Sequence, residues 1–510
     1  MRSFDKQTLY GGLGTLNVSR SPLMVSEQDI VECNNLTYEH DNLEKAGGAD
    51  KINTTAITGN PTIAAHHEFV SDAGVVEQVV YTTDGKLLVV NSSGIAKTLA
   101  TGVGTNRVGV FAEGSTGGDK MLFFVNGATD MLMYDGGSSA SAIGDPPADW
   151  STTKPTWIVA HEGRMWAGCD NHFIYGSVPN THDDFINTGT VFFNVYPGEG
   201  QGVVGAASIW ARLFLFKYKK GIYYLDDSDP DFTNWDVKRH SRNVGSLGHR
   251  SIVEVDNDIL FASPQGFIHA LSTIQEFSDV ETSAILPIQI GPLIRENVDF
   301  TRGRSTQSMY YATKKKAMWG FTKKGSTVNN LIIGFDFHAG IAQGFSSIRD
   351  ICETLSEYTD PGTELSVPVA GDDNGFLWKL DTLTFDKDGV AYEGLFKTDD
   401  IDLYPNGDRR GNLKELEIVF DQVGDWSVTI DVIVDGIYRE SKLFSLRGVG
   451  AVLGAFTLGQ DKLGIVTFQN NRGRLHGDGR RVRLMGKNVA LGETFRIVSQ
   501  TVKYLPGNDR

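Results

Sequence analysis

The chain has 510 residues, which is more than one hydrophobic core usually supports, so we expect at least two separate cores. Its hydrophobic content of 40% and charged content of 22% are those of a globular protein and exclude a disordered or fibrous chain. The chain holds 58 Gly but only 15 Pro. Abundant glycine without a collagen period favours many short strands joined by tight turns.

The sequence contains no signal for disulfides, export or membrane insertion. Three cysteines, Cys33, Cys169 and Cys352, lie far apart and form no CxxC pair, which indicates neither a disulfide framework nor a zinc site. Residues 1–6 lack an apolar segment, so we expect no signal peptide. No window approaches roughly 18 uncharged apolar residues, so we expect synthesis in the cytoplasm and no membrane insertion.

The net charge of −16 is distributed unevenly along the chain. Residues 400–510 carry 16 Lys and Arg against 14 Asp and Glu, whereas residues 1–399 carry 31 against 49. An acidic surface repels the phosphates of nucleic acids, so we expect no sequence-specific DNA binding, although DNA could pass such a surface without adhering. Charge that simply keeps the protein soluble is the plainer alternative.

From residue 75 onward, a pattern of short apolar strands and polar turns recurs. Each repeat contains two or three runs rich in Val, Ile, Phe, Tyr and Trp, separated by Gly, Asp or Asn. The last strands of the repeats end near residues 90, 134, 175, 225, 271, 335 and 380, at a spacing of about 40–50 residues with one longer gap. The predicted strands are residues 75–81 and 86–90; 108–111, 121–125 and 131–134; 157–160, 164–168 and 173–177; 203–209, 213–218 and 222–225; 252–255, 259–262 and 267–271; 309–312, 317–321 and 331–335; and 367–370 and 376–380.

This spacing is typical of propeller blades. A small sheet with two apolar faces cannot bury both by itself, whereas sheets arranged radially around an axis bury both and leave only short edges. We therefore predict an all-β fold, a β-propeller of about six or seven blades. The blade number depends on whether the N-terminal residues donate a strand that closes the ring. The only predicted helix covers residues 350–357.

The two ends of the chain differ from the repeats. From about residue 390 longer strands alternate apolar and polar residues, as in a sheet with one solvated face. These strands are predicted at residues 413–420, 426–434, 464–469, 481–485 and 495–504. We expect three parts: an N-terminal extended arm at residues 1–70, the propeller at 71–389 and a C-terminal β-sandwich-like domain at 390–510.

Three short motifs could suggest chemistry. The only GxGxxG sequence spans residues 200–205, but a dinucleotide site needs a helix after the motif and here the following residues are β-rich. We interpret it as a turn into a blade strand. His66 and His67 have no acid at metal-ligand spacing beyond Glu68, which favours a surface loop. Residues 182–184, His-Asp-Asp, are likewise interpreted as a turn rather than a base with its orienting acid.

An acidic loop after one predicted strand is the candidate partner-docking site. Its alternating side-chain oxygens could hold Ca²⁺, but a proline at position 230 disrupts EF-like geometry and no bidentate Glu follows at the usual distance. We favour an exposed loop between blades in which the tryptophan anchors a partner, and we expect no metal or cofactor. The candidate docking residues are Asp226, Asp227, Asp229, Asp231 and Trp235.

Propellers also host glycosidases, so a carbohydrate-binding or glycosidase-type β-propeller is the alternative function. Repeated Asp-box turns of the form SxDxGxxW would indicate a sialidase-like enzyme, but the nearest stretch, residues 228–235, has different spacing and does not recur. Paired carboxylates for sugar chemistry can come from distant blades, so the sequence leaves this alternative open. Our expectation is nevertheless that the protein is not an enzyme.

Taken in order, several phrases resemble the tail nozzle proteins, also called packaged-DNA stabilisation proteins, of short-tailed phages. The resemblance covers most of the chain, and the order of the phrases carries it. At the start, these phrases are Gly11-Gly12-Leu13, Ser21-Pro22-Leu23, Glu27, Asn34-Asn35-Leu36 and residues 43–48. In the middle and at the end they are residues 161–168, 174–177, 183–185, 215–217, 221–225, 244–248, 258–266 and 495–504.

The resemblance implies a structural virion protein without catalytic residues. Proteins of this family form a ring, usually a homohexamer, below the adaptor that meets the portal, as part of the head-tail connector. The ring continues the DNA channel, helps to retain packaged DNA before ejection and offers a docking surface for tail fibres or spikes. DNA would pass through the lumen without sequence-specific binding.

Overall fold

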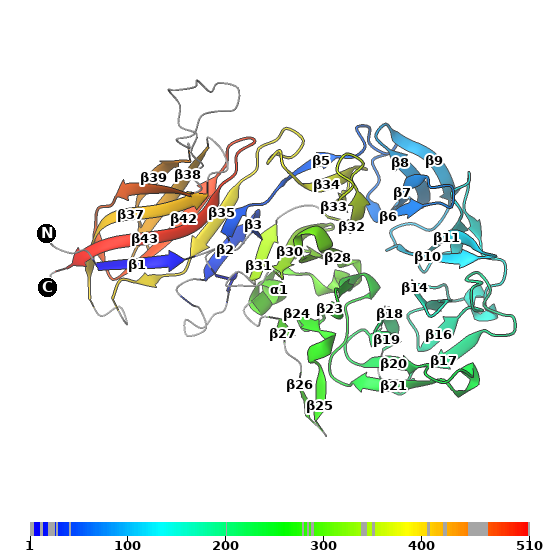
Figure 1. Ribbon diagram of the computed structural model, residues 1–510. Helices are drawn as coiled ribbons and strands as arrows, with labels where there is room; N and C mark the ends of the chain where they lie inside the picture. The colour runs from blue at the N-terminus through cyan, green and yellow to red at the C-terminus, as the bar shows by residue number, and fades with distance from the viewer. Residues whose placement is uncertain are drawn as a thin grey trace, which may run out of the picture. The chain divides into compact units, whose positions relative to one another are not determined.

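The computed structural model divides the chain into two compact units (Figure 1). The propeller unit comprises residues 51–332 and 350–380, and the sandwich unit comprises residues 1–50, 333–349 and 381–510. The structure describes residues 5–10, 14–18, 26, 29–39, 42–199, 201–277, 280–282, 285–286, 290–337, 344–348, 352–404, 409–421, 426–446 and 468–507.

Seven four-stranded antiparallel sheets form the blades, numbered here in chain order. Blades 1 and 2 consist of β6 (Ile63–Val70), β7 (Val76–Thr82), β8 (Lys86–Asn91) and β9 (Gly94–Thr101), and of β10 (Val110–Thr116), β11 (Asp119–Val125), β12 (Leu132–Tyr134) and β13 (Ser141–Ala142). Blades 3 and 4 consist of β14 (Trp157–His161), β15 (Arg164–Gly168), β16 (Phe173–Gly176) and β17 (Val191–Asn194), and of β18 (Val203–Ile209), β19 (Arg212–Lys217), β20 (Ile222–Asp226) and β21 (Asp236–Ser241).

The remaining three blades follow the same order. Blade 5 consists of β22 (Ile252–Val255), β23 (Asp258–Ser263), β24 (Phe267–Ala270) and β27 (Ile285–Leu286), and the two-stranded sheet of β25 (Gln275–Phe277) and β26 (Val280–Thr282) is inserted before β27. Blade 6 consists of β28 (Gln307–Tyr311), β29 (Lys316–Thr322), β30 (Asn329–Asp336) and β31 (Gly344–Ile348). Blade 7 consists of β32 (Thr354–Thr359), β33 (Ser366–Gly371), β34 (Leu377–Thr382) and β5 (Gly48–Lys51). A short helix, α1 (Gly291–Asn297), lies between blades 5 and 6 in sequence.

The blades close into a ring around an axis (Figure 1). The first strand of each blade contacts the first strand of the next, in the order β6, β10, β14, β18, β22, β28 and β32, and β32 contacts β6. These seven strands are therefore the inner strands that surround the axis. The predicted β-propeller is confirmed, and the structure gives seven blades.

The hydrophobic cores lie between neighbouring blades. Successive residues of a strand point to opposite faces of its sheet. On β11, Phe124 joins the core shared with blade 1, while Phe123 and Val125 join the core shared with blade 3. Each described core therefore depends on two blades, and one blade alone would expose an apolar face to water.

Residues at the start of the propeller unit close the ring by binding to blade 7. Asn53 is fully buried and its side chain donates to the carbonyl oxygens of Gly375 (3.0 Å) and Thr55 (2.8 Å). The same side chain accepts the backbone N–H of Leu377 at 2.7 Å. The backbone N–H of Ile52 donates to the Leu377 carbonyl at 2.8 Å. Segments more than 300 positions apart in the sequence thus complete one sheet.

Two predictions from the sequence differ from the structure. Residues 354–357 of the predicted helix form the start of the inner strand β32, because pairing with β33 and contact with β6 override the local preference. Residues 352–353 lead into the strand, and residues 350–351 lie outside the described residues. The predicted arm at residues 1–70 instead contains strands in both units. Their partners lie hundreds of positions away, so these short strands give little local signal.

The sandwich unit has two antiparallel sheets, in which neighbouring strands are often far apart in the sequence. In the first, β3 (Leu36–Glu39), β4 (Asn42–Lys45), β43 (Arg496–Pro506), β37 (Gly411–Asp421) and β40 (Phe468–Arg474) follow one another, with β1 (Asp5–Tyr10) also pairing with β43 and β41 (Asp478–Gly479) with β37. In the second, the order is β2 (Ile30–Asn34), β35 (Gly394–Thr398), β42 (Arg481–Asn488), β38 (Ser427–Val434) and β39 (Ile437–Ser445), with β36 (Ile401–Asp402) pairing with β42.

The core of this unit confirms the alternation expected from the sequence. On β38, Val428, Ile430, Val432 and Val434 are all buried. Phe420 of the first sheet contacts Phe444 of the second, with ring centroids 6.4 Å apart. The predicted strand at 464–469 is only partly described, because residues 464–467 lie outside the described residues.

We expect Asn53→Ala to lower the free energy of unfolding by about 2–3 kcal/mol, because it removes three hydrogen bonds of a buried side chain and leaves the backbone N–H of Leu377 in blade 7 without its partner. Urea denaturation at neutral pH measures the change. Asn374→Ala is the matched control, since Asn374 is exposed and its amide binds only the neighbouring Asp373; it should change stability by less than about 0.5 kcal/mol. Equal effects of the two substitutions would contradict this account of ring closure.

Candidate functional site

The propeller axis has two chemically different ends. At one end, where several inner strands finish, lies a cavity of about 710 Å³ lined by residues of blades 1, 5, 6 and 7. Four acids line this cavity: Glu68, Glu254, Asp256 and Glu357. At the other end, where the inner strands begin, two cavities of about 230 and 370 Å³ are lined by several arginines. The propeller therefore presents an acidic axial cavity and a basic axial region.

The acids of the acidic cavity differ in their surroundings. Partial desolvation raises the pKa of Glu254 and of Glu357, and the Glu68 carboxylate contributes to the rise at Glu357. Glu68 is held by the backbone N–H of Thr359 at 2.9 Å, and Tyr310 donates to Asp256 at 3.1 Å. A carboxyl group with a raised pKa beside other acidic side chains is an arrangement that acid–base chemistry can use.

The predicted docking loop lies within a blade and not between blades. It joins β20 to β21 of blade 4 and contains a single 3₁₀ turn, Phe232–Asn234. The expectation of an inter-blade loop was wrong, because the sequence pattern did not show β21 as the fourth strand of the same sheet. Four-stranded blades require such an outer hairpin connection.

The acids of this loop bind groups within the loop or its own blade, with one exception. Asp231 caps the 3₁₀ turn by accepting the Thr233 N–H at 3.0 Å, and Asp229 accepts from the Asn234 amide at 3.1 Å. Asp226 forms an ion pair with Lys238 and accepts from Ser228 at 2.8 Å. The structure places these carboxylates in turn-stabilising roles.

Trp235 is half-buried against the core between blades 3 and 4. Its indole N–H donates to the Asp229 carbonyl at 2.6 Å, and its ring lies 5.3 Å from the Arg164 guanidinium carbon. The side chain is thus occupied by packing within the protein, although part of its surface remains available to a partner.

Asp227, the fifth docking candidate, belongs to a Ser–His–Asp arrangement between two blades. His161 Nδ1 lies 2.7 Å from Ser208 Oγ, and His161 Nε2 lies 2.9 Å from Asp227 Oδ2. The His161 side chain is 1% exposed. Hydrolases use the same three residue types in a triad, but the ring nitrogens here have the opposite partners, and none of the cavities described above is lined by these residues.

The same histidine–serine contact recurs elsewhere in the ring, which indicates a structural role. On β6, His66 Nδ1 lies 2.5 Å from Ser356 Oγ of blade 7, and His66 Nε2 lies 2.7 Å from Gln78 Oε1 of its own blade. Its neighbour His67 points the other way, toward Glu113 of blade 2, at 3.1 Å. The expectation of a surface loop for this pair was wrong: consecutive residues of an inner strand face opposite neighbouring blades.

The GxGxxG motif leads into β18, so the interpretation as a turn into a blade strand is confirmed for residues 201–205; Gly200 lies outside the described residues. Gly205 has a packing role. A Cβ atom at this position would lie 2.6 Å from the His249 Cα of the turn that precedes blade 5. Only glycine permits this close approach of two blades.

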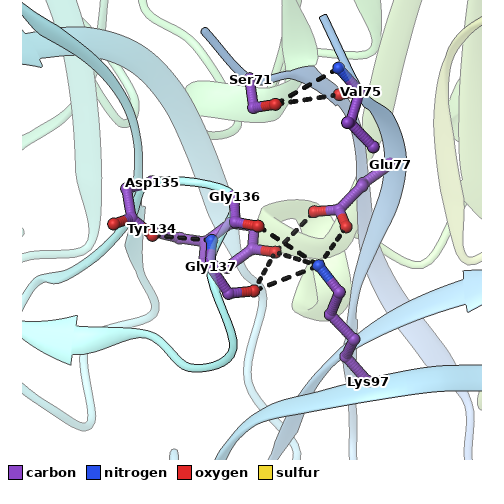
Figure 2. A network of polar contacts seen from close by, with 8 residues as sticks. All are labelled: Ser71, Val75, Glu77, Lys97, Tyr134, Asp135, Gly136 and Gly137. Atoms are coloured by element: carbon purple, nitrogen blue, oxygen red, sulfur yellow. Dashed lines mark hydrogen bonds and ion pairs between the residues drawn. The ribbon is translucent and has the colours of Figure 1, made fainter. Parts of the chain in front are cut away.

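A polar network joins blades 1 and 2 (Figure 2). Glu77, 7% exposed, forms an ion pair with Lys97 and accepts a hydrogen bond from Tyr134 Oη at 2.5 Å. Lys97 Nζ also donates to the carbonyl oxygens of Gly136 (3.3 Å) and Gly137 (3.1 Å). Burial and the Glu77 carboxylate raise the pKa of Tyr134, which keeps its hydroxyl protonated as a donor. These groups satisfy one another's hydrogen-bonding capacity, which indicates that the network holds blades 1 and 2 together.

Among the described residues, no group of three or more His, Cys, Asp or Glu side chains is arranged to hold a metal ion. In the same part of the chain, no helix is long and apolar enough to cross a membrane. The three cysteines are buried thiols.

Sequence reasoning did not find the residues at the two ends of the axis. The basic residues Arg107, Arg250 and Arg304 are separated by 143 and 54 positions and share no motif. Each is the contribution of one blade, and only closure of the ring brings them together. One signal was available: each precedes or begins a predicted inner strand, and the starts of inner strands meet at the same end of a propeller.

Fold and cavities define the chain as a seven-bladed β-propeller protein with an additional β-sandwich unit. No family model matches the chain, and no curated protein matches it. Among solved structures, it is similar to the computationally designed Ika8 protein, with 12% identity and a TM-score of 0.37 over 74% of this chain and 99% of that chain. It is also similar to BBS1N in its complex with ARL6DN, with 13% identity and a TM-score of 0.41 over 66% of this chain and 96% of that chain. Similarities this low carry no argument about function.

Stability should depend on pH through His66. Burial lowers the pKa of His66 from 6.5 to about 3, so the folded state keeps this ring neutral while the unfolded state protonates it. We expect the free energy of unfolding to fall as the pH is lowered from 6.5 toward 3, with this group contributing about 1.4 kcal/mol per pH unit.

The comparison of wild type with His66→Gln isolates this contribution, because Gln keeps hydrogen-bonding capacity but takes up no proton. In urea titrations at several pH values the variant should lose a corresponding part of the slope. An unchanged slope in the variant would show that His66 is not the group responsible.

Proposed function

We propose that the protein is a ring-forming structural component of a short-tailed phage tail, of the nozzle or packaged-DNA stabilisation kind. In this role it extends the DNA channel below the portal and adaptor, helps to retain packaged DNA, and offers surface to tail fibres or spikes. The site of action is the virion tail.

The observation that carries the proposal is the order of family-like phrases along the chain. Residues 161–168 cover the end of β14, the turn after it and β15 in blade 3, and residues 258–266 cover β23 of blade 5 and the turn after it. The closing phrase at 495–504 lies on β43 of the sandwich unit. The opening phrases at residues 11–13, 21–23 and 27 lie outside the described residues.

The architecture suits a load-bearing ring. Every described core is shared by two blades, and polar contacts such as Glu77–Lys97 fix blade to blade. A closed propeller built in this way resists shear, while its loops remain free to contact partners. The strongly acidic net charge of −16 would disfavour adhesion of passing DNA.

We expect the purified chain to assemble into a ring of about six copies, because the family that it resembles forms hexamers. Light scattering after size exclusion should give a mass near six times the 55.8 kDa of the chain. The ring should also fail to retain duplex DNA in a gel-shift experiment at low ionic strength. A persistent monomer, or tight duplex binding, would contradict the proposal.

A second candidate function, a carbohydrate-binding or glycosidase-type propeller, is favoured by one observation. The acidic axial cavity brings four carboxyl groups together, and desolvation raises the pKa of two of them, Glu254 and Glu357. Glycosidases use a carboxylic acid with a raised pKa as the general acid and a second carboxylate as base or nucleophile.

This candidate predicts that the wild-type protein binds or hydrolyses an oligosaccharide in a glycan screen, and that Glu254→Gln or Glu357→Gln lowers hydrolysis at least about 100-fold. Glu364→Gln is a control, because Glu364 is exposed and outside the cavity. If the nozzle proposal is right, wild type and both variants should show no hydrolysis.

A further inference from the structure

The basic end of the propeller axis forms a confined space with more positive than negative groups. The cavity of about 230 Å³ is lined by Arg107, Arg250 and Arg304 and by one acid, Asp170. The adjoining cavity of about 370 Å³ shares Arg107 and adds Arg302 and one acid, Glu353. His249 also lines the first cavity, and burial lowers its pKa to about 4, so this imidazole adds no charge at neutral pH. Four arginines therefore face two acids.

Both acids are already engaged. Asp170 forms an ion pair with Arg304. Glu353 is buried, which raises the pKa of its carboxyl group, and it accepts the backbone N–H of Asn329 at 3.0 Å. Asp170 thus interacts with Arg304 and Glu353 with Arg302, and no described ion pair involves Arg107 or Arg250.

Arg250 crosses the axis and, within the described part of the chain, is held without a carboxylate partner. It belongs to the turn that opens blade 5, yet its guanidinium donates to Ala64 O of blade 1 (2.9 Å), Gly109 O of the segment before blade 2 (3.1 Å) and Thr354 Oγ1 of blade 7 (2.7 Å). These acceptors fix the side chain but leave its positive charge uncompensated. Burial accordingly lowers the pKa of Arg250 to about 10.

Arg107 supplies a second, solvent-exposed positive charge to the same cavity. The side chain is exposed and, within the described residues, forms no ion pair. It lies in the segment that leads into the inner strand β10, where Asn106 has a φ of 52° and turns the chain. Asn106 lines both cavities beside Arg107. The cavity thus combines a preorganised central guanidinium with a second one that can move toward a ligand.

We infer that this basic axial cavity binds an oxyanion of the phosphate class. Guanidinium groups bind tetrahedral and planar oxyanions through paired, charge-assisted hydrogen bonds. A concave positive site within a chain of net charge −16 is also the place where field lines favour an anion. The inference does not depend on the proposed tail function.

The size of the cavity restricts the ligand. Its volume of about 230 Å³ is below the roughly 300–1,000 Å³ of sites that enclose drug-sized molecules. The space suits one phosphate group with ordered water rather than a buried base and sugar. The phosphate can come from solution or from the end of a nucleic acid strand, and both sources present the same chemistry.

The test is titration calorimetry of the full chain with inorganic phosphate at low ionic strength. We expect saturable binding that weakens with added salt, and an affinity at least about tenfold lower in Arg107→Gln, because one charged donor is lost. Arg212→Gln is the matched control: Arg212 is also exposed and lies in the propeller unit, but outside both cavities. It should bind phosphate like the wild type. Circular dichroism and thermal melting confirm that both variants are folded.

Arg107 is chosen rather than Arg250 because loss of the three inter-blade bonds of Arg250 could unfold the ring. No binding at millimolar phosphate, or equal weakening in Arg107→Gln and Arg212→Gln, would overturn the inference.

A competition experiment identifies the source of the phosphate: a short oligonucleotide with a 5′-phosphate displaces inorganic phosphate if strand ends bind, and its unphosphorylated counterpart does not. The ring mass is measured separately, so failure here leaves the proposed function standing, and the reverse also holds.

Discussion

The structure of the propeller unit depends on the need to cover both faces of every small sheet. Alternation along strands such as β11 sends Phe123 and Phe124 into different cores, and each core is completed only by the next blade. A sheet at an open end would expose an apolar face and an unpaired edge. Closure removes that end: Asn53 and Ile52, from the start of the unit, bind the backbone of blade 7. The seven blades therefore stabilise one another as a ring.

The radial arrangement of the blades also explains the contacts of polar side chains near the axis. Inner strands approach one another closely, so their side chains reach neighbouring blades, as His66 does to Ser356 and His161 to Ser208. A Ser–His–Asp set arises in this way at Asp227, and its recurrence in part at His66 shows that the geometry serves blade contacts. The cavities at the ends of the axis, where polar groups face solvent, are therefore better candidates for a binding site than these contacts between blades.

The two ends of the axis have opposite charge, and this polarity bears on both candidate functions. The acidic cavity contains the groups that sugar chemistry would need, whereas the acidic chain as a whole suits a surface along which DNA passes. The basic cavity is too small for a duplex and offers isolated guanidinium groups instead. Local and overall charge thus act on different scales, since a confined site is screened less than an open surface.

The sequence by itself determined the repeat of short strands, most strand positions between residues 75 and 380, and the alternation on β38, because these depend on local turn chemistry and on a period of two. It did not reveal β32, whose residues carry a helical pattern, or the strands before residue 51, whose partners are distant. Tertiary structure alone decided that the acidic loop belongs to blade 4, that His66 is buried, and that Arg107, Arg250 and Arg304 share a cavity. Those outcomes depend on contacts between blades, and no local pattern in the sequence shows which distant residues ring closure brings within reach.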